Sequence, residues 1–75
     1  MVGTDEIHQA LEAAFPDARI QVEDTTGGGD HFQVRVVTTA FAGVGLVEQH
    51  RKIYAALGPL MQRIHALQLH TAAAS

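Results

Sequence analysis

The hydrophobic and polar positions of this chain change their spacing several times, and each spacing predicts one element of secondary structure. Over residues 4–15 the apolar side chains recur three and four positions apart, as on one face of an α-helix, and Pro16 ends the pattern. Thr4 can cap this helix because its hydroxyl can accept a hydrogen bond from a free amide of the first turn. Asp5 and Glu6 suit the positive end of the helix dipole. The apolar stripe consists of Ile7, Leu11, Ala14 and Phe15.

Two segments in the middle of the chain alternate with a period of two, which is typical of strands with one buried face. They are residues 19–24 and residues 32–38. Residues 25–30, between them, contain three consecutive glycines, which tolerate positive φ and have no side chain to pack. We therefore expect a β-hairpin with its loop at residues 25–30. The expected inward positions are Ile20, Val22, Phe32, Val34 and Val36.

The rest of the chain predicts a second helix and a third strand. Helical spacing returns over residues 46–57, and Gly58-Pro59 should end that helix, with a short helical turn at residues 60–63. Residues 66–71 alternate again, and residues 72–75 are expected to be a frayed tail. The second helix should bury Leu46, His50, Ile53 and Leu57, with Val47 and Tyr54 beside them, and the last strand Leu67 and Leu69.

The order helix, strand, strand, helix, strand predicts an α+β fold. An antiparallel hairpin joined by a crossover helix to a third strand gives a mixed three-stranded sheet with the helices packed on one face. With 75 residues, the chain should form a single domain over residues 1–75, with an ordered core at about 4–71. No apolar run approaches the roughly 20 residues that cross a bilayer, and no export signal is recognisable. We therefore expect a cytoplasmic protein without a membrane partner.

Composition and charge narrow the range of functions. The chain is 47% hydrophobic and 17% charged, which is too apolar for a disordered protein. It has no cysteine, so any thiolate ligand to a metal must come from a partner. The net charge of −3 is unevenly divided: residues 1–30 hold seven of the eight acidic side chains, whereas residues 31–75 hold four of the five Lys and Arg and four of the five histidines. The second part could therefore meet an anionic partner.

Three segments together carry a resemblance to a known family. They are Gly29-Asp30-His31-Phe32-Gln33-Val34, the predicted second helix from Val47 to Leu57, and Ile64-His65-Ala66-Leu67. In this order and spacing, and with Val22-Glu23-Asp24-Thr25-Thr26 before the loop, the chain resembles the BolA family from Thr4 to Thr71. The resemblance implies a BolA-like fold related to the class II KH domain, with the order αββαβ.

The resemblance also implies a function. BolA-like proteins take part in iron–sulfur cluster trafficking with monothiol glutaredoxins, and some bacterial members act in stress response and transcription regulation. In the shared [2Fe–2S] complex the glutaredoxin supplies a cysteine thiolate and a bound glutathione thiolate. The BolA partner supplies two ligands, which correspond here to His65 and, from the loop, His31. His65 and Arg63 would lie at the partner interface. The chain would be a monomer alone and a heterodimer with glutaredoxin.

The histidines can also be weighed on their chemistry alone. Imidazole is a suitable ligand for iron, and two histidines replace two cysteines on one iron of Rieske-type clusters. Without the resemblance, a single histidine at a strand start is more often a structural residue. His50 is interpreted as a hydrogen-bonded histidine of the core or its boundary, and His8 and His70 as surface residues. No pair of candidate ligands has the sequence spacing of a structural zinc site, so such a site is not expected.

The alternative hypothesis is a DNA-binding regulator. Arg51 and Lys52 would lie exposed on the second helix, which could face a nucleic-acid groove. The strongly acidic first helix would repel phosphates if it lay on the same side. An enzyme is not expected, because the sequence offers no pairing of a nucleophile with a base.

Overall fold

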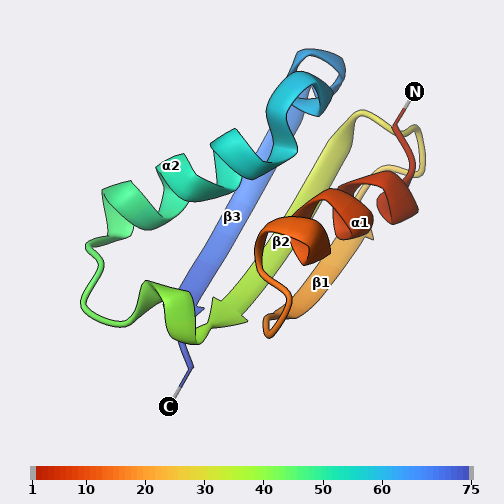
Figure 1. Cartoon of the computed structure of the whole chain (residues 1–75). Helices are drawn as coiled ribbons and strands as arrows, with labels where there is room; N and C mark the ends of the chain where they lie inside the picture. The colour runs from red at the N-terminus through yellow and green to blue at the C-terminus, as the bar shows by residue number, and fades with distance from the viewer. Residues whose placement is uncertain (1, 75) are drawn as a thin grey trace.

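The computed structural model describes residues 2–74 and has the predicted order of elements. Both α-helices lie on the same side of one sheet (Figure 1). Two short 3-10 helices, η1 and η2, stand before and after the second α-helix. The elements are α1 (Thr4–Ala14), β1 (Arg19–Asp24), β2 (His31–Thr38), η1 (Thr39–Phe41), α2 (Leu46–Leu57), η2 (Gly58–Arg63) and β3 (Ala66–Ala73).

The sheet is mixed, with β2 at its centre and the strand order β1-β2-β3. β1 pairs antiparallel with β2, so that Val22 lies opposite Val34. β3 pairs parallel with β2, which places Leu69 opposite Val34. A parallel pair needs a crossover connection, and α2 provides it. The α+β prediction is therefore confirmed.

The hydrophobic core lies between the sheet and the two α-helices. The period of two along β2 puts every second side chain on the helix side, and these are buried as predicted. The rings of Phe15 and Phe41 meet edge to face, with centroids 5.3 Å apart. Full burial of one such side chain contributes about 1.5–3 kcal/mol. The buried hydrophobic residues are Val2, Ile7, Leu11, Phe15, Phe32, Val34, Val36, Phe41, Ile53, Leu57 and Ile64.

The N-cap of α1 is Gly3, so the prediction of Thr4 as the cap is wrong. The side chain of Val2 is buried and its N–H donates to the carbonyl of Gly29 at 3.3 Å, which anchors the chain just before Gly3. Thr4 is consequently the first residue inside the helix. The Glu6 carboxylate accepts the N–H of Gly3 at 3.3 Å, which is one half of a capping box.

The buried stripe of α2 differs from the predicted one. Leu46 is 60% exposed, Val47 70% and Tyr54 43%, whereas Gln49 is buried. Gln49 lies four residues before Ile53, on the same line of the helix surface that faces the core. Its side-chain amide donates to the carbonyl of Val44 at 2.7 Å, whereas its Oε1 is buried without a hydrogen-bond partner among the described residues. At the N-terminal end of α2, the buried residues therefore lie on the helix line next to the predicted one.

The last strand is longer than the alternation predicted. β3 continues through Ala73, so the expected fraying of Ala72 and Ala73 is wrong, and Ser75 lies outside the described residues. β2 runs as far as Thr38 and offers backbone partners to these alanines. The N–H of Ala74 donates to the carbonyl of Thr38 at 3.1 Å. Strand pairing satisfies backbone groups whatever the side chains are, so the hydrophobic pattern gave no signal here.

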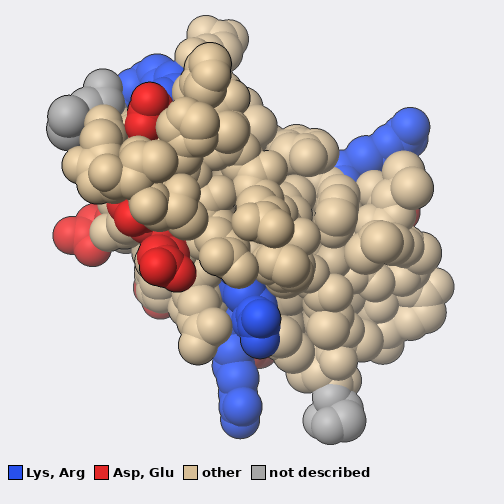
Figure 2. Space-filling model, turned by 180° about the vertical axis from the view of Figure 1, so that it is seen from behind, with Lys and Arg blue, Asp and Glu red and all other residues tan. Residues whose placement is uncertain are grey.

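The other face of the sheet carries no helix, and we call it the open face. It presents the residues that alternate with the core positions, mostly polar. Figure 2 shows this side, where basic groups adjoin one another at the lower middle and most of the acidic groups lie on one flank. Arg19 and Arg35 line one hollow of this face. No helix among residues 2–74 combines the length and the apolar character that crossing a bilayer requires.

Candidate functional site

Two histidines from separate elements come together at one end of the sheet. The imidazole rings of His31 and His65 have centroids 5.1 Å apart and planes inclined by 48°. His31 is the first residue of β2 and lies opposite Ala66, so the parallel register brings the preceding residue, His65, beside it. The His31 side chain is 40% exposed and His65 is exposed as well, so a partner can reach both rings.

The backbone between these histidines is held by one carbonyl group. The carbonyl oxygen of Asp30 accepts the N–H of His65 at 2.9 Å and the N–H of Ala66 at 3.0 Å. Because Asp30 directly precedes His31, this pair of hydrogen bonds fixes the two histidine backbones relative to each other. The placement of the rings therefore follows from the start of the β2–β3 pairing.

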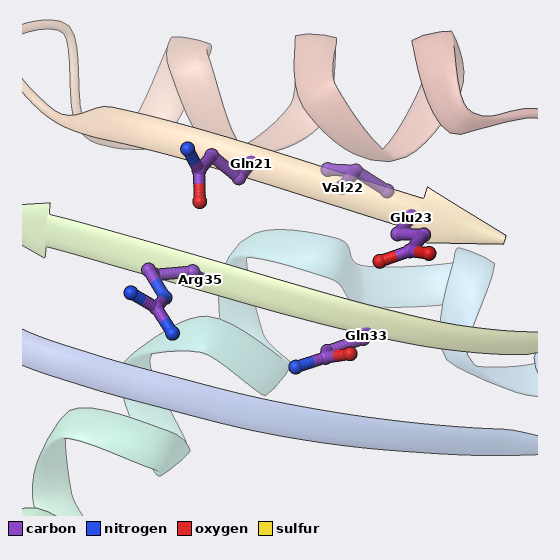
Figure 3. Close-up of a pocket in the computed structure, with 5 residues that line it drawn as sticks. All are labelled: Gln21, Val22, Glu23, Gln33 and Arg35. Carbon is purple, nitrogen blue, oxygen red and sulfur yellow. The ribbon is translucent and has the colours of Figure 1, made fainter. Parts of the chain in front are cut away.

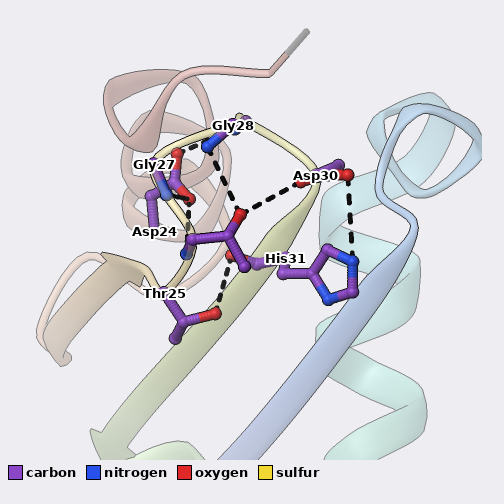
Figure 4. A network of polar contacts seen from close by, with 8 residues as sticks. Asp24, Thr25, Gly27, Gly28, Asp30 and His31 are labelled. Atoms are coloured by element: carbon purple, nitrogen blue, oxygen red, sulfur yellow. Dashed lines mark hydrogen bonds and ion pairs between the residues drawn. The ribbon is translucent and has the colours of Figure 1, made fainter.

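The loop before His31 is organised by the carboxylate of Asp24. It accepts backbone N–H groups from Gly27 at 2.8 Å, Gly29 at 2.9 Å and Thr26 at 3.3 Å (Figure 4). Gly27 and Gly29 have φ of 79° and 76°, a region that residues with a Cβ rarely adopt. The glycine-rich segment is thus a defined turn, which confirms the predicted hairpin loop.

Asp30 connects this loop to the imidazole of His31. One carboxylate oxygen of Asp30 accepts the hydroxyl of Thr26 at 3.2 Å, and the other lies 3.8 Å from Nε2 of His31 (Figure 4). The N–H and the hydroxyl of Thr25 both donate to the carbonyl of His31, at 3.0 and 3.2 Å. A carboxylate beside a histidine can orient the ring.

The spacing of the two rings is compatible with two coordination positions on one metal. A metal bound about 2.1 Å from an imidazole nitrogen lies about 3.2 Å from the ring centroid, so two rings on one tetrahedral ion have centroids about 5 Å apart. The observed 5.1 Å agrees with that spacing. Among residues 2–74 there is no group of three or more His, Cys, Asp and Glu side chains able to hold a metal. A metal bound by this pair would therefore need further ligands from outside the described residues.

The other predicted site residues lie around this pair or away from it. Arg63, at the end of η2, contacts the carboxylate of Glu6 at 3.4 Å and so links η2 to α1. Arg51 and Lys52 are exposed on α2, and Arg51 lies 3.7 Å from Glu48. Across residues 2–74, no hydrogen bond or ion pair joins these two cations to the histidine pair.

The remaining histidines have other surroundings. His50 is half-buried on α2, and its Nε2 is buried without a hydrogen-bond partner among the described residues, so the expected hydrogen bond is absent at that atom. His8 lies 3.8 Å from Glu12 on α1, and His70 is exposed on the open face.

Sequence reasoning missed the two aspartates that shape the site. Asp24 could have been found, because Asp-Thr-Thr-Gly is typical of a turn in which the aspartate accepts the next backbone amides. The main contribution of Asp30 comes from its backbone carbonyl, which leaves no trace in the residue type.

Comparison with known proteins shows the family to which the chain is similar. Residues 6–75 match the family described as BolA-like protein. Protein BOLA2 of Arabidopsis thaliana is 37% identical over 73 residues, an alignment that covers 96% of this chain and 78% of the relative. The DNA-binding transcriptional regulator BolA of Escherichia coli is 34% identical over 79 aligned positions, with 95% and 75% covered.

A solved structure of a BolA protein homologue has the same fold. The structure of a BolA protein homologue from Coxiella burnetii superposes with a TM-score of 0.79 at 39% sequence identity. The match covers 97% of this chain and 92% of that one. The family match, the sequence relatives and the shared fold together place this chain in the BolA-like family.

Proposed function

We propose that this BolA-like chain is an adaptor that binds a monothiol glutaredoxin and co-ligates a [2Fe–2S] cluster through His65 and His31, for cluster trafficking or iron regulation. The adjacency of the two imidazoles carries the proposal, since they come from different elements and are 5.1 Å apart. Both rings stand at the surface, where a second protein can approach.

The ligand chemistry supports this assignment. A [2Fe–2S] cluster has four protein or cofactor ligands, and two imidazoles on one iron are known from Rieske-type centres. The chain has no cysteine, so the glutaredoxin cysteine and its bound glutathione would supply the two thiolates. The fixed backbone at Asp30 would hold both imidazoles in place before the partner arrives.

The test is reconstitution of the complex from its parts. The chain is mixed with a monothiol glutaredoxin, glutathione, ferrous iron and sulfide, and visible absorption and circular dichroism are recorded. We expect His65→Ala and His31→Ala to change the spectrum and shorten the lifetime of the cluster. His70→Ala, at another exposed histidine, is the matched control and should behave as wild type. A His65→Ala complex with the wild-type spectrum and lifetime would show that the ligand assignment is wrong.

A metal-independent heterodimer is distinguished in the same experiment. Titration calorimetry of the chain with glutaredoxin, without iron and sulfide, measures the affinity of the proteins alone. If this affinity equals that of the cluster-bound complex and the histidine variants leave it unchanged, the cluster is not part of the assembly. The proposal expects tighter association when the cluster is present.

DNA binding is the second candidate, because the relative from Escherichia coli is named as a DNA-binding transcriptional regulator. In this chain Arg51 and Lys52 on α2 would make the phosphate contacts, although the chain as a whole carries a net charge of −3. Phosphate contacts make affinity fall steeply with salt. Binding to a labelled duplex at two salt concentrations, with the double variant Arg51→Ala/Lys52→Ala, tests it. No binding at low salt would eliminate this candidate.

A further inference from the structure

β1 is an edge strand that no other segment among residues 2–74 pairs with on its outer side. It pairs with β2 on one side only, and its register runs from Arg19 to Asp24 without a bulge. Soluble proteins usually block such edges with proline, charged side chains, a bulge or a covering segment. β1 contains no proline and no lysine, and its charged residues are Arg19, Glu23 and Asp24. Among residues 2–74 no backbone hydrogen bond outside the sheet reaches it.

The register shows which backbone groups of β1 point outward. The N–H of Thr25 donates to the carbonyl of His31, so these two residues form a hydrogen-bonded pair at the end of the hairpin. In antiparallel pairing such pairs recur at every second residue. Arg19, Gln21 and Glu23 therefore direct their backbone groups towards β2. The N–H and C=O groups of Ile20 and Val22 face the open edge.

The side chains on the open face of β1 carry a self-complementary pattern. Arg19 and Glu23 lie two residues on either side of Gln21, and both are exposed. In the described residues neither forms an ion pair or a side-chain hydrogen bond. Figure 3 shows Gln21 and Glu23 on the same face as Gln33 and Arg35 of β2, around a shallow hollow of about 370 Å³. A second strand placed along β1 would find these side chains free to pair.

We propose that β1 pairs antiparallel with β1 of a second copy of this chain, about a two-fold axis through Gln21. In this register Arg19 lies opposite Glu23 of the other copy, at both ends of the pair. Ile20 lies opposite Val22, so the outward backbone groups of both strands meet and can form hydrogen bonds. The two three-stranded sheets become one continuous sheet.

Other registers do not combine these features. A two-fold axis at Val22 would place Gln21 opposite Glu23 and leave Arg19 beyond the paired segment. An axis at Ile20 would place Arg19 opposite Gln21. Opposite charges that face each other across a strand pair are favourable and like charges are not. The charge pattern therefore selects the register centred on Gln21.

The opposite edge of the sheet lacks such a pattern. β3 carries no Lys, Arg, Asp or Glu between Ala66 and Ala73, so no charge pairing fixes a register there. Its first residue follows His65, which belongs to the proposed ligand pair. Pairing through β1 leaves that edge free, so self-association does not depend on the proposed cluster function. It also refines the expectation of a monomer, because a short edge pairing gives a weak dimer that forms at high concentration.

The experiment uses two charge-reversal variants. Each variant should disfavour its own homodimer, and a mixture of the two should favour a heterodimer. Sedimentation equilibrium of the full chain over micromolar to millimolar concentrations measures the dimer dissociation constant. R19E and E23R should each weaken dimerisation about tenfold, because like charges then face each other at both ends of the pair. An equimolar mixture of R19E and E23R should form a heterodimer near wild-type affinity, since every cross-strand pair is again opposite in charge.

R35E is the control variant. Arg35 is exposed on the same face but belongs to β2, and the change in net charge equals that of R19E. It should leave the dissociation constant within about twofold, and far-ultraviolet circular dichroism checks that every variant is folded. Three results would overturn the proposal: a monomer at millimolar concentration, no heterodimer between R19E and E23R, or an R35E effect as large as that of R19E.

Discussion

At the scale of single residues, the polar contacts that matter most join parts of the chain that are far apart in sequence. Asp17, in the turn between α1 and β1, accepts hydrogen bonds from the hydroxyls of Thr39 at 2.6 Å and Thr38 at 3.1 Å. These bonds, the one from Thr39 first, lower the pKa of the Asp17 carboxyl below its ordinary value. They tie the first turn to the far end of β2.

Asp17 should give the stability of the protein a pH dependence at acid pH. A carboxyl whose pKa is lowered by folding stabilises the native state above its unfolded pKa, about 3.9, and this contribution is lost as pH falls through the lower folded pKa. We expect Asp17→Asn to be less stable than wild type at pH 7 and the difference to narrow as pH falls below about 4. Urea denaturation between pH 7 and pH 2.5 measures it. A difference that stays constant over this range would contradict the assigned cause.

His50 should be replaceable without loss of stability. Its buried Nε2 has no partner in the described structure, and a buried polar atom without a hydrogen bond costs about 1–3 kcal/mol. We expect His50→Leu to raise the free energy of unfolding by about 1 kcal/mol at pH 7. The control is His8→Leu, because His8 is partly exposed and should give no such gain. Destabilisation by His50→Leu would mean that Nε2 is hydrogen-bonded in solution, for instance to a buried water.

At the scale of elements, the hairpin loop is a structured unit. The Asp24 carboxylate gathers three backbone amides, and the loop ends at His31, so the shape of the loop determines where β2 begins. Loops normally have low local stability, and hydrogen bonds of this kind raise it.

Asp24→Ala should loosen this loop selectively. The amides of Gly27 and Gly29 lose their acceptor, so we expect hydrogen exchange at both positions to accelerate at least tenfold. The global free energy of unfolding should fall by about 1–2 kcal/mol. Glu23→Ala, one residue earlier and without side-chain partners among the described residues, is the matched control, measured at micromolar concentration. Equal exchange rates in the two variants would exclude the proposed role of Asp24.

The elements differ in how well hydrophobic spacing predicted them. The strict alternation of Phe32, Val34 and Val36 identified the buried face of β2, because a strand has only two faces. A helix has several adjacent lines, and α2 carries apolar residues on more than one. The spacing predicts the period of α2 but not which of its lines is buried, so Leu46, which is exposed, is expected inside, and the burial of Gln49 is not predicted.

At the scale of the whole molecule, one core joins both helices to the sheet. Ile53 on α2 is fully buried in the same cluster as Ile7 and Leu11 of α1 and Val34 of β2. A small domain with a single core normally unfolds in one cooperative transition. No element is therefore expected to melt independently.

Truncation of Ile53 tests whether the domain unfolds in a single cooperative transition. We expect Ile53→Ala to cost about 2–5 kcal/mol and Ile53→Val about 0.5–1.5 kcal/mol. In both variants the transitions followed by far-ultraviolet circular dichroism and by the fluorescence of Tyr54 should coincide. Tyr54 is the only tyrosine of the chain, so its signal reports on α2 alone. Separate transitions would show that α2 unfolds apart from the sheet.

The site was predictable in its residues but not in its geometry. The resemblance to BolA-like proteins pointed to His31 and His65, and the structure brings their rings together, while their role as ligands stays a prediction. Their distance depends on the register between two parallel strands that a helix separates in sequence. That register is set by backbone hydrogen bonds at Asp30, which no residue pattern reveals.

The Asp30 carbonyl, which accepts two backbone N–H groups, also affects the free energy of binding to the two histidines. The two imidazoles are adjacent, as a chelate requires, only in the folded chain, because in the unfolded chain they are separated by the whole of β2 and α2. The loop-closure entropy cost of bringing the two rings together is offset by the free energy of folding, so the free energy of metal binding does not have to offset it. Whatever binds both rings at once must therefore stabilise the native state by mass action, and partial unfolding at the start of β3 would release it.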